Sequence, residues 1–427
     1  MALAQVEQRV ERRQNRTPQR VLPDWPIKAA FVLMPLYFLL GLQGFMWVVL
    51  AVPMLAALGQ KRDLVVFKGT SWWMFFLGAA LLSAVNLDTV GRVAGWTLRF
   101  GYFAAAIIYG LYMLNGGRSL RVSTIVRCLT FLWMATVVGG YLGFVFGAFS
   151  YRSPMYFVMP ADLLENELIN TLVTPGFADL QNIIGVELPR PKAPFAYTNT
   201  WGSMLALLTP FAVISLTEKD VGLNPTLIRV MLAASVVPAV VSLNRGLWLS
   251  LGIGCAYVAV RLGLLGSGGL LIRMMFAVGA LALVLLITPL GDLIVTRIDT
   301  GHSNEGRFEL VMTSVEGTAE RPLLGWGAPR PNRDGLPPIG THGQLWYLMF
   351  SHGILGAVSY CAFFASVGLR TWRQPSASGL WAHAVLIIGA VQMLFYLTMP
   401  NQLFVMMAAA AVATRVQSGT ERFVSAS

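Results

Sequence analysis

The sequence predicts an all-α integral membrane protein with about twelve transmembrane helices and two long extracytoplasmic loops. Of its 427 residues, 56% are hydrophobic and 12% are charged, whereas about 25% of the residues of a soluble domain are charged. Several apolar runs reach roughly 17 to 25 residues, the length that a helix needs to cross a hydrocarbon core of about 30 Å. Helices follow because lipid offers no partner for the hydrogen bonds of the backbone.

The N-terminal part of the chain sets the orientation of the predicted spans. Residues 1–26 are polar and rich in arginine, and no small-residue cleavage site follows the first apolar run, so we expect a cytoplasmic basic tail. The apolar run 29–58 is too long for one span and short for two. Because Lys61 and Arg62 follow it and basic residues concentrate in the cytoplasm, the run should be a hairpin of two short helices that turns at 41–44.

Ten further spans complete the predicted membrane domain, which covers residues 27–416. They are 70–87, 93–114, 122–147, 198–216, 226–243, 246–262, 270–291, 344–368, 379–399 and 402–414. Both termini, including the tail 417–427, are then cytoplasmic, and most lysine and arginine residues lie on that side. Removing any one span would place the basic residues that follow it on the outer side. The distribution of basic residues therefore constrains the number of spans.

Two outer segments, 148–197 and 292–343, are much longer than the other outer connections. Loops of this length in a compact domain are usually functional. In the first, 159–170 has the pattern of an amphipathic helix at the membrane interface, and 189–197 is rich in proline. We expect the first loop to cover the site or to guide an acceptor, and the second to carry the chemistry.

Neither nucleic acid nor metal is an expected partner. The formal net charge is +11, but the basic residues occur in small groups between apolar runs, so topology explains the charge. The cysteines lie inside apolar segments without CxxC spacing, which indicates neither a metal site nor a disulfide framework. Asp162, Glu165 and Glu167 fit a solvated helix face, and the first outer turn is too short for a D-x-D pair. We therefore expect no metal and no cofactor.

His342 is the first candidate for chemistry, because it stands where the second loop re-enters the membrane just before Gln344. An imidazole at such a half-wet junction titrates near neutrality and can accept a proton from a hydroxyl delivered from the aqueous side. The alternative is a histidine that only caps or anchors the helix. His352 and His383 lie within predicted spans and are expected to be core residues.

Arginines on the outer side are the second group of candidates. Arg245 lies in the short turn 242–246 between two spans, where its five donors could bind a diphosphate bidentately or could extend toward lipid headgroups. Arg99 lies inside a predicted span, and a charge within the membrane is a functional candidate by default. Arg99, Arg190 and Arg321 are secondary candidates for the substrate site.

Three stretches of the sequence resemble the O-antigen ligase family. They are Ser-Leu-Asn-Arg-Gly at 242–246, Gly-Arg-Phe-Glu-Leu-Val at 306–311 followed by Arg-Pro-Leu-Leu-Gly-Trp-Gly at 321–327, and 341–353, which fits an H-[NSQ]-x9-G pattern at His342 and Gly353. These polytopic bacterial enzymes move a glycan from an undecaprenyl-diphosphate carrier to an acceptor at the outer face of the cytoplasmic membrane. One position departs: Gly343 follows the histidine where Asn, Ser or Gln is expected, with Gln344 one step later.

The resemblance implies a GT-C-like fold and a metal-independent, inverting glycosyl transfer. It implies that Arg245 and Arg307 bind the donor diphosphate and that His342 is the catalytic base. The partners would be a polyprenyl-diphosphate-linked glycan, an acceptor that is a glycan, lipid or protein, and the membrane lipid itself. A polysaccharide polymerase or a protein O-oligosaccharyltransferase would use the same donor. A transporter or flippase of lipid-linked sugars is a different class, and the lack of an internal repeat argues against it.

Overall fold

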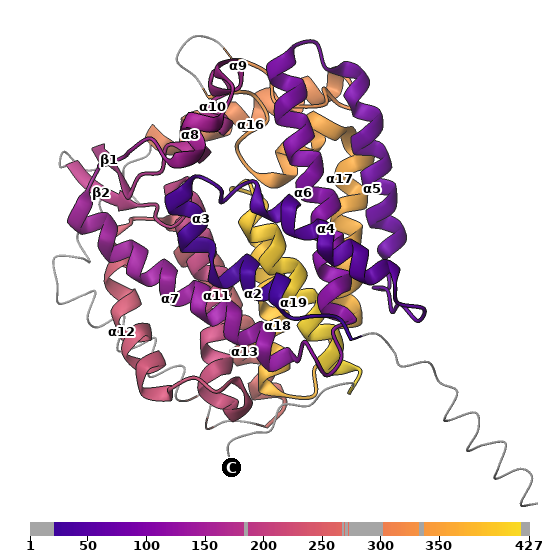
Figure 1. Cartoon of the computed structure of the whole chain (residues 1–427), viewed down its shortest axis with the longest axis vertical. Helices are drawn as coiled ribbons and strands as arrows, with labels where there is room; N and C mark the ends of the chain where they lie inside the picture. The colour runs from indigo at the N-terminus through magenta and orange to yellow at the C-terminus, as the bar shows by residue number, and fades with distance from the viewer. Residues whose placement is uncertain are drawn as a thin grey trace, which may run out of the picture.

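The computed structural model describes residues 21–182, 187–266, 269, 272, 302–332 and 337–419, and this part of the chain is mostly helical (Figure 1). Its helices are α2 (Trp25–Val32), α3 (Met34–Leu40), α4 (Met46–Gly59), α5 (Thr70–Leu82), η1 (Ser83–Asn86), α6 (Val90–Leu114), α7 (Val122–Phe146), α8 (Pro154–Val158), α9 (Ala161–Leu164), α10 (Glu167–Val173), α11 (Thr198–Thr217), η2 (Lys219–Val221), α12 (Pro225–Val241), α13 (Arg245–Leu264), α16 (His302–Glu320), α17 (Gln344–Arg370), α18 (Ala377–Gln392) and α19 (Asn401–Gln417).

Five of the described helices are long and apolar enough to cross a membrane, namely α6, α7, α11, α13 and α17. Four apolar helices are shorter: α4, α5 with η1, α12 and α18. Each predicted span in the described residues coincides with a helix, and the predicted span 270–291, apart from residue 272, lies outside them. The span predicted at 379–399 is shorter than expected, because α18 ends at Gln392 and an irregular segment follows. The structure thus supports a helical membrane protein, and the count of twelve spans stays a prediction.

The predicted N-terminal hairpin is present, with α2 and α3 on one arm and α4 on the other. Gly41 ends α3 with a φ of 75°, a left-handed conformation that glycine adopts without strain. A Cβ at this glycine would also collide with the side chain of Ser153, so the turn packs against the first long loop. On the α4 arm, Trp47 stacks on Phe404 with ring centroids 4.1 Å apart and donates its indole N–H to Asn401 over 3.0 Å.

The first long loop folds differently from its prediction. The expected helix at 159–170 is divided between α9 and α10, because Asn166 caps α10 by accepting hydrogen bonds from the backbone N–H groups of Leu168 and Ile169. The loop also contains an antiparallel hairpin of β1 (Ala178–Asn182) and β2 (Glu187–Pro191), in which Ala178 pairs with Pro191. The prediction of an all-α chain is therefore wrong for this segment.

The second long loop is also partly helical, because α16 occupies 302–320. This helix packs against α17: a Cβ at Gly317 would lie 2.6 Å from the ring of Phe350, and Ser314 accepts a hydrogen bond from the backbone N–H of Gly340 over 3.2 Å. Figure 1 shows α16 with α8, α9 and α10 at the upper end of the view. The parts of the two long loops therefore gather at one end of the helical bundle.

Candidate functional site

The start of α17 lies where the stretches singled out in the sequence meet. About a third of the way along this helix, Gly353 has a φ of 69° and a ψ of −179°, which breaks the helical hydrogen-bond ladder. The segment 322–327 replaces the lost bonds: Pro322 accepts from the N–H of Ile354 over 2.8 Å, and Phe350 accepts from the N–H of Trp326 over 2.8 Å. A Cβ at Gly353 would collide with the carbonyl group of Leu323, so this position requires glycine.

The turn at 242–246 is attached to the start of α17 by Tyr396. Its hydroxyl donates a hydrogen bond to Asn244, the residue before Arg245, and its carbonyl accepts one from the backbone N–H of Gln344 over 2.8 Å. Asn244 also caps α13 by accepting from the N–H of Leu247 over 3.1 Å. One tyrosine thus joins the turn that carries Arg245 to the helix that follows His342.

Arg190 joins the same turn from the first long loop. Its side chain is 6% exposed, and its Nε donates to the carbonyl of Ser242 over 2.9 Å. The Nη1 group donates to the side chain of Gln181 on the neighbouring strand over 2.5 Å. Arg245 lies three residues after Ser242 and is half-buried. The β-hairpin, through Arg190, therefore brings a second guanidinium group to the turn.

The hydrogen bonds of Thr341 assign the proton on the ring of His342. The hydroxyl of Thr341 donates to the carbonyl of Pro338 over 2.7 Å, and its oxygen lies 3.1 Å from Nδ1 of His342. With the hydroxyl proton directed at Pro338, the Thr341 oxygen accepts a hydrogen bond from Nδ1 in the tautomer whose proton is on that nitrogen. His342 is half-buried, as the predicted interfacial position requires.

The position after the histidine explains the departure from the family pattern. Gly343 has a φ of 114° and a ψ of 142°, and a Cβ there would lie 2.7 Å from the ring of Trp346 and 2.9 Å from the carbonyl of Leu394. An Asn, Ser or Gln could not stand there without moving the backbone. The amide oxygen of Gln344 instead accepts the backbone N–H of Thr398 over 3.1 Å and helps to hold the segment beside α17.

Two further candidates lie along the neighbouring helices. Arg99, in α6, holds its guanidinium carbon 5.9 Å from the centre of the Tyr347 ring, which is in the first turn of α17. Arg307 belongs to α16, and its side chain lies outside the described part of the structure.

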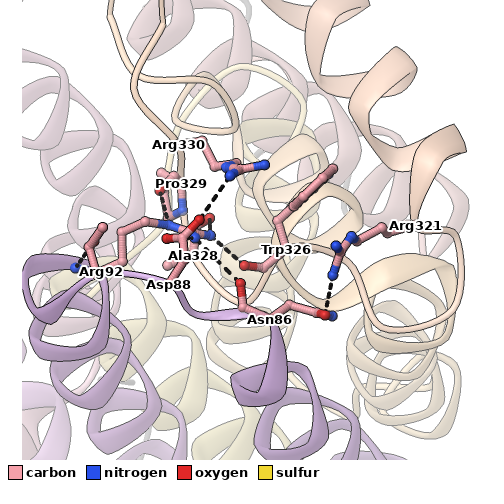
Figure 2. Close-up of polar contacts among 9 residues, drawn as sticks. Asn86, Asp88, Arg92, Arg321, Trp326, Ala328, Pro329 and Arg330 are labelled. Carbon is pink, nitrogen blue, oxygen red and sulfur yellow. Dashed lines mark hydrogen bonds and ion pairs between the residues drawn. The ribbon is translucent and has the colours of Figure 1, made fainter.

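Arg321, in contrast, belongs to a separate cluster of arginines around Trp326 (Figure 2). The guanidinium carbons of Arg321 and Arg330 each lie 4.2 Å from the centre of the Trp326 ring, on opposite sides of it. Arg321 donates to the side chain of Asn86, and Arg330 forms an ion pair of 2.8 Å with Asp88. These contacts attach the second loop to the start of α6 and engage the guanidinium group of Arg321 there.

Arg92 lies at the centre of this cluster and was not singled out in the sequence. Its side chain is 9% exposed and donates to Asp88 and to the carbonyl groups of Trp326, Ala328 and Pro329. The hydrogen bond from Arg92, together with its charge and that of Arg330, holds the pKa of the Asp88 carboxyl below its usual range. An arginine one turn from a helix start resembles an interfacial residue, so no sequence signal indicated the carbonyl partners.

Comparison with known proteins adds nothing to this geometry: no family model matches the chain, and no curated protein is similar to it in sequence. Among the described residues, no group of His, Cys, Asp and Glu side chains has the arrangement of a metal site. The arrangement around the start of α17 instead provides guanidinium groups and one imidazole, which can stabilise an anion and accept a proton.

Proposed function

We propose that the chain is a membrane glycosyltransferase resembling the O-antigen ligases, which transfers a glycan from a polyprenyl-diphosphate carrier to an acceptor hydroxyl. The observation that supports this most directly is the clamp formed by Tyr396. It joins the turn bearing Arg245 to the start of α17 next to His342, although the two stretches are about one hundred residues apart in the sequence. The acceptor would be a glycan, a lipid or a protein.

The proposal includes a topology of twelve spans in the bacterial cytoplasmic membrane, with both termini in the cytoplasm. The shorter apolar helices α4, α5, α12 and α18 would then cross the membrane as well. In this arrangement α6, α11, α13 and α17 all begin at the outer face. Their N-terminal ends carry the positive end of the helix dipole, which favours an anionic substrate on that side.

In the proposed reaction the arginines stabilise the leaving group. The acceptor oxygen attacks the anomeric carbon, the bond from that carbon to the diphosphate oxygen breaks, and the configuration inverts. Negative charge develops on the lipid diphosphate, where Arg245 and Arg307 would bind, while Arg190 would hold the turn that carries Arg245. Loss of one such donor typically costs about 3 kcal/mol of transition-state stabilisation.

His342 would accept the proton of the attacking hydroxyl through Nε2. The hydrogen bond between Nδ1 and Thr341 keeps the ring in the tautomer that this role requires. A positioned base contributes roughly a hundred- to ten-thousand-fold to the rate. The half-buried position of His342 would leave it accessible to an acceptor that arrives from the aqueous side.

The test is glycan transfer by the purified protein in detergent, with a polyprenyl-diphosphate-linked glycan as donor. We expect His342→Ala to reduce the transfer rate at least a hundred-fold while the protein keeps its thermal stability. Wild-type rates in this variant would contradict the role of the histidine. Transfer in detergent, where no second compartment exists, would exclude a flippase as the sole function, and the identity of the product would separate a ligase from a polymerase or a protein transferase.

Arg245→Gln provides an independent measure of the diphosphate site. We expect a loss of roughly a hundred-fold in kcat/KM, the equivalent of about 3 kcal/mol. The matched control is Arg229→Gln, which removes an exposed arginine from the opposite end of α12 and should leave transfer unchanged. Equal effects of the two substitutions would indicate a general response to lost charge and would remove Arg245 from the site.

A further inference from the structure

Arg99 has an environment unlike that of an arginine that only stabilises the fold. It lies about two and a half turns inside α6, which begins at Val90, and its side chain is half-buried. Within the described part of the chain its guanidinium group forms no hydrogen bond and no ion pair, and its closest ring contact is Tyr347 at 5.9 Å. The described residues therefore provide no acceptor for its five N–H donors.

Three tyrosine hydroxyls lie near Arg99, and its charge acts on all of them: Tyr102, Tyr347 and Tyr197, the last of which precedes α11. The hydroxyl of Tyr347 lies 3.4 Å from Nε2 of the buried His352. The hydroxyl of Tyr102, one turn further along α6, is buried and has no hydrogen-bond partner among the described residues. The guanidinium group of Arg99 and the hydroxyl of Tyr102 therefore provide the donors of this place.

The lack of a side chain at Gly95 accommodates the guanidinium group of Arg99. A Cβ at Gly95 would lie 2.9 Å from Nη1 of Arg99 and 3.7 Å from the amide nitrogen of Asn166, which caps α10. Two acidic groups, Glu167 and Asp179, act on Tyr197. Glu167 is exposed, and the side chain of Asp179 forms an ion pair with Lys192 over 2.7 Å. Neither forms an ion pair with Arg99 in the described residues.

We propose that Arg99, with the hydroxyl of Tyr102, binds a phosphate group carried by a membrane lipid. A guanidinium group and a hydroxyl match an anion with several acceptor oxygens, and lipid phosphates are anions of the membrane surface. The source we favour is the polyprenyl diphosphate of the donor, because Tyr347 lies five residues after His342. In that form the inference rests on the proposed function, and a phospholipid headgroup is the other source of the same chemistry.

The experiment measures binding of two probes to the purified protein in nanodiscs: undecaprenyl diphosphate without a glycan, and phosphatidylglycerol. We expect Arg99→Gln to weaken binding of undecaprenyl diphosphate by about 10- to 100-fold, as for lost hydrogen bonds to a charged group. Arg99→Lys should retain part of the affinity, because it keeps the charge and loses the planar pair of donors. Arg118→Gln, which removes an exposed arginine beyond the other end of α6, should bind as the wild type does.

A second variant keeps the test informative if Arg99→Gln does not fold. Tyr102→Phe removes a buried hydroxyl that has no partner in the described residues, so its thermal stability should be equal to that of the wild type or higher. Binding should weaken by about 3- to 10-fold, the effect of one neutral donor. Unchanged binding in both variants would overturn the site.

The two probes distinguish the sources. Weaker binding of undecaprenyl diphosphate alone supports the donor as the ligand, whereas weaker binding of phosphatidylglycerol alone supports the phosphate site and assigns it to a phospholipid. If the wild type transfers no glycan but Arg99→Gln still weakens lipid binding, the proposed function is contradicted and the phosphate site remains. If the wild type transfers glycan and Arg99→Gln binds both lipids as the wild type does, the proposed function stands and the phosphate site is overturned.

Discussion

Arg92 and Arg99 lie two turns apart on the same helix, yet their surroundings differ. Arg92 is buried and donates to one carboxylate and several carbonyl groups of the second loop. Arg99 is half-buried and lies beside the ring of Tyr347, with no hydrogen bond among the described residues. An arginine whose donors are occupied by the protein serves the fold, whereas one whose donors are unoccupied is suited to bind a ligand.

The largest expected effect comes from exchanging these two arginines one at a time for glutamine. Arg92→Gln should lower the free energy of unfolding by about 3 kcal/mol, because it leaves buried carbonyl groups without donors. Arg99→Gln should change it by less than about 0.5 kcal/mol. Thermal unfolding in detergent measures both. A similar loss of stability in the two variants would show that Arg99 is a structural residue too.

A smaller effect is expected for Arg321, which extends the comparison to an exposed arginine. Arg321→Gln keeps a donor for Asn86 but loses the contact with the Trp326 ring, so it should cost about 0.5 to 1 kcal/mol of stability. Glycan transfer per folded molecule should stay at the wild-type rate. A hundred-fold loss of transfer without loss of stability would return Arg321 to the substrate site.

The smallest effect concerns the pH dependence of the cluster around Arg92. The pKa of Asp88 is lowered in the folded protein, chiefly by the hydrogen bond from Arg92. Its contribution to stability is therefore present above the pKa of the unfolded chain and is lost as the pH falls through the lowered pKa. Asp88→Asn should remove this part of the acid destabilisation. Thermal unfolding at a series of pH values between neutrality and about 3 checks it; identical profiles would contradict the role of the carboxylate.

The helix positions were predictable because each depends on the length and composition of a single apolar run. The division of the predicted helix 159–170 into two helices was harder to predict, because Asn166 caps a new helix inside an otherwise helical pattern. The strands β1 and β2 were missed because each has only five residues, and because Pro189 and Pro191 argue against a strand.

For the candidate site, sequence reasoning identified residue types better than partners. The pattern around His342 and Gly353 indicated a glycine, and the structure shows the close approach of the Leu323 carbonyl that requires it. Tyr396, Asn244 and Thr341 were missed because each acts through a hydrogen bond that only the fold creates. The same holds for Arg92, whose carbonyl partners in the second loop lie more than two hundred positions away.

The break at Gly353 has a mechanical consequence for the second loop. Because the backbone of 322–327 supplies the hydrogen bonds that the broken helix lacks, this segment acts as a wedge between the two halves of α17. The half that begins next to His342 cannot change its tilt unless the wedge moves with it. A substrate that displaces the second loop would therefore also move the first half of α17, and with it His342.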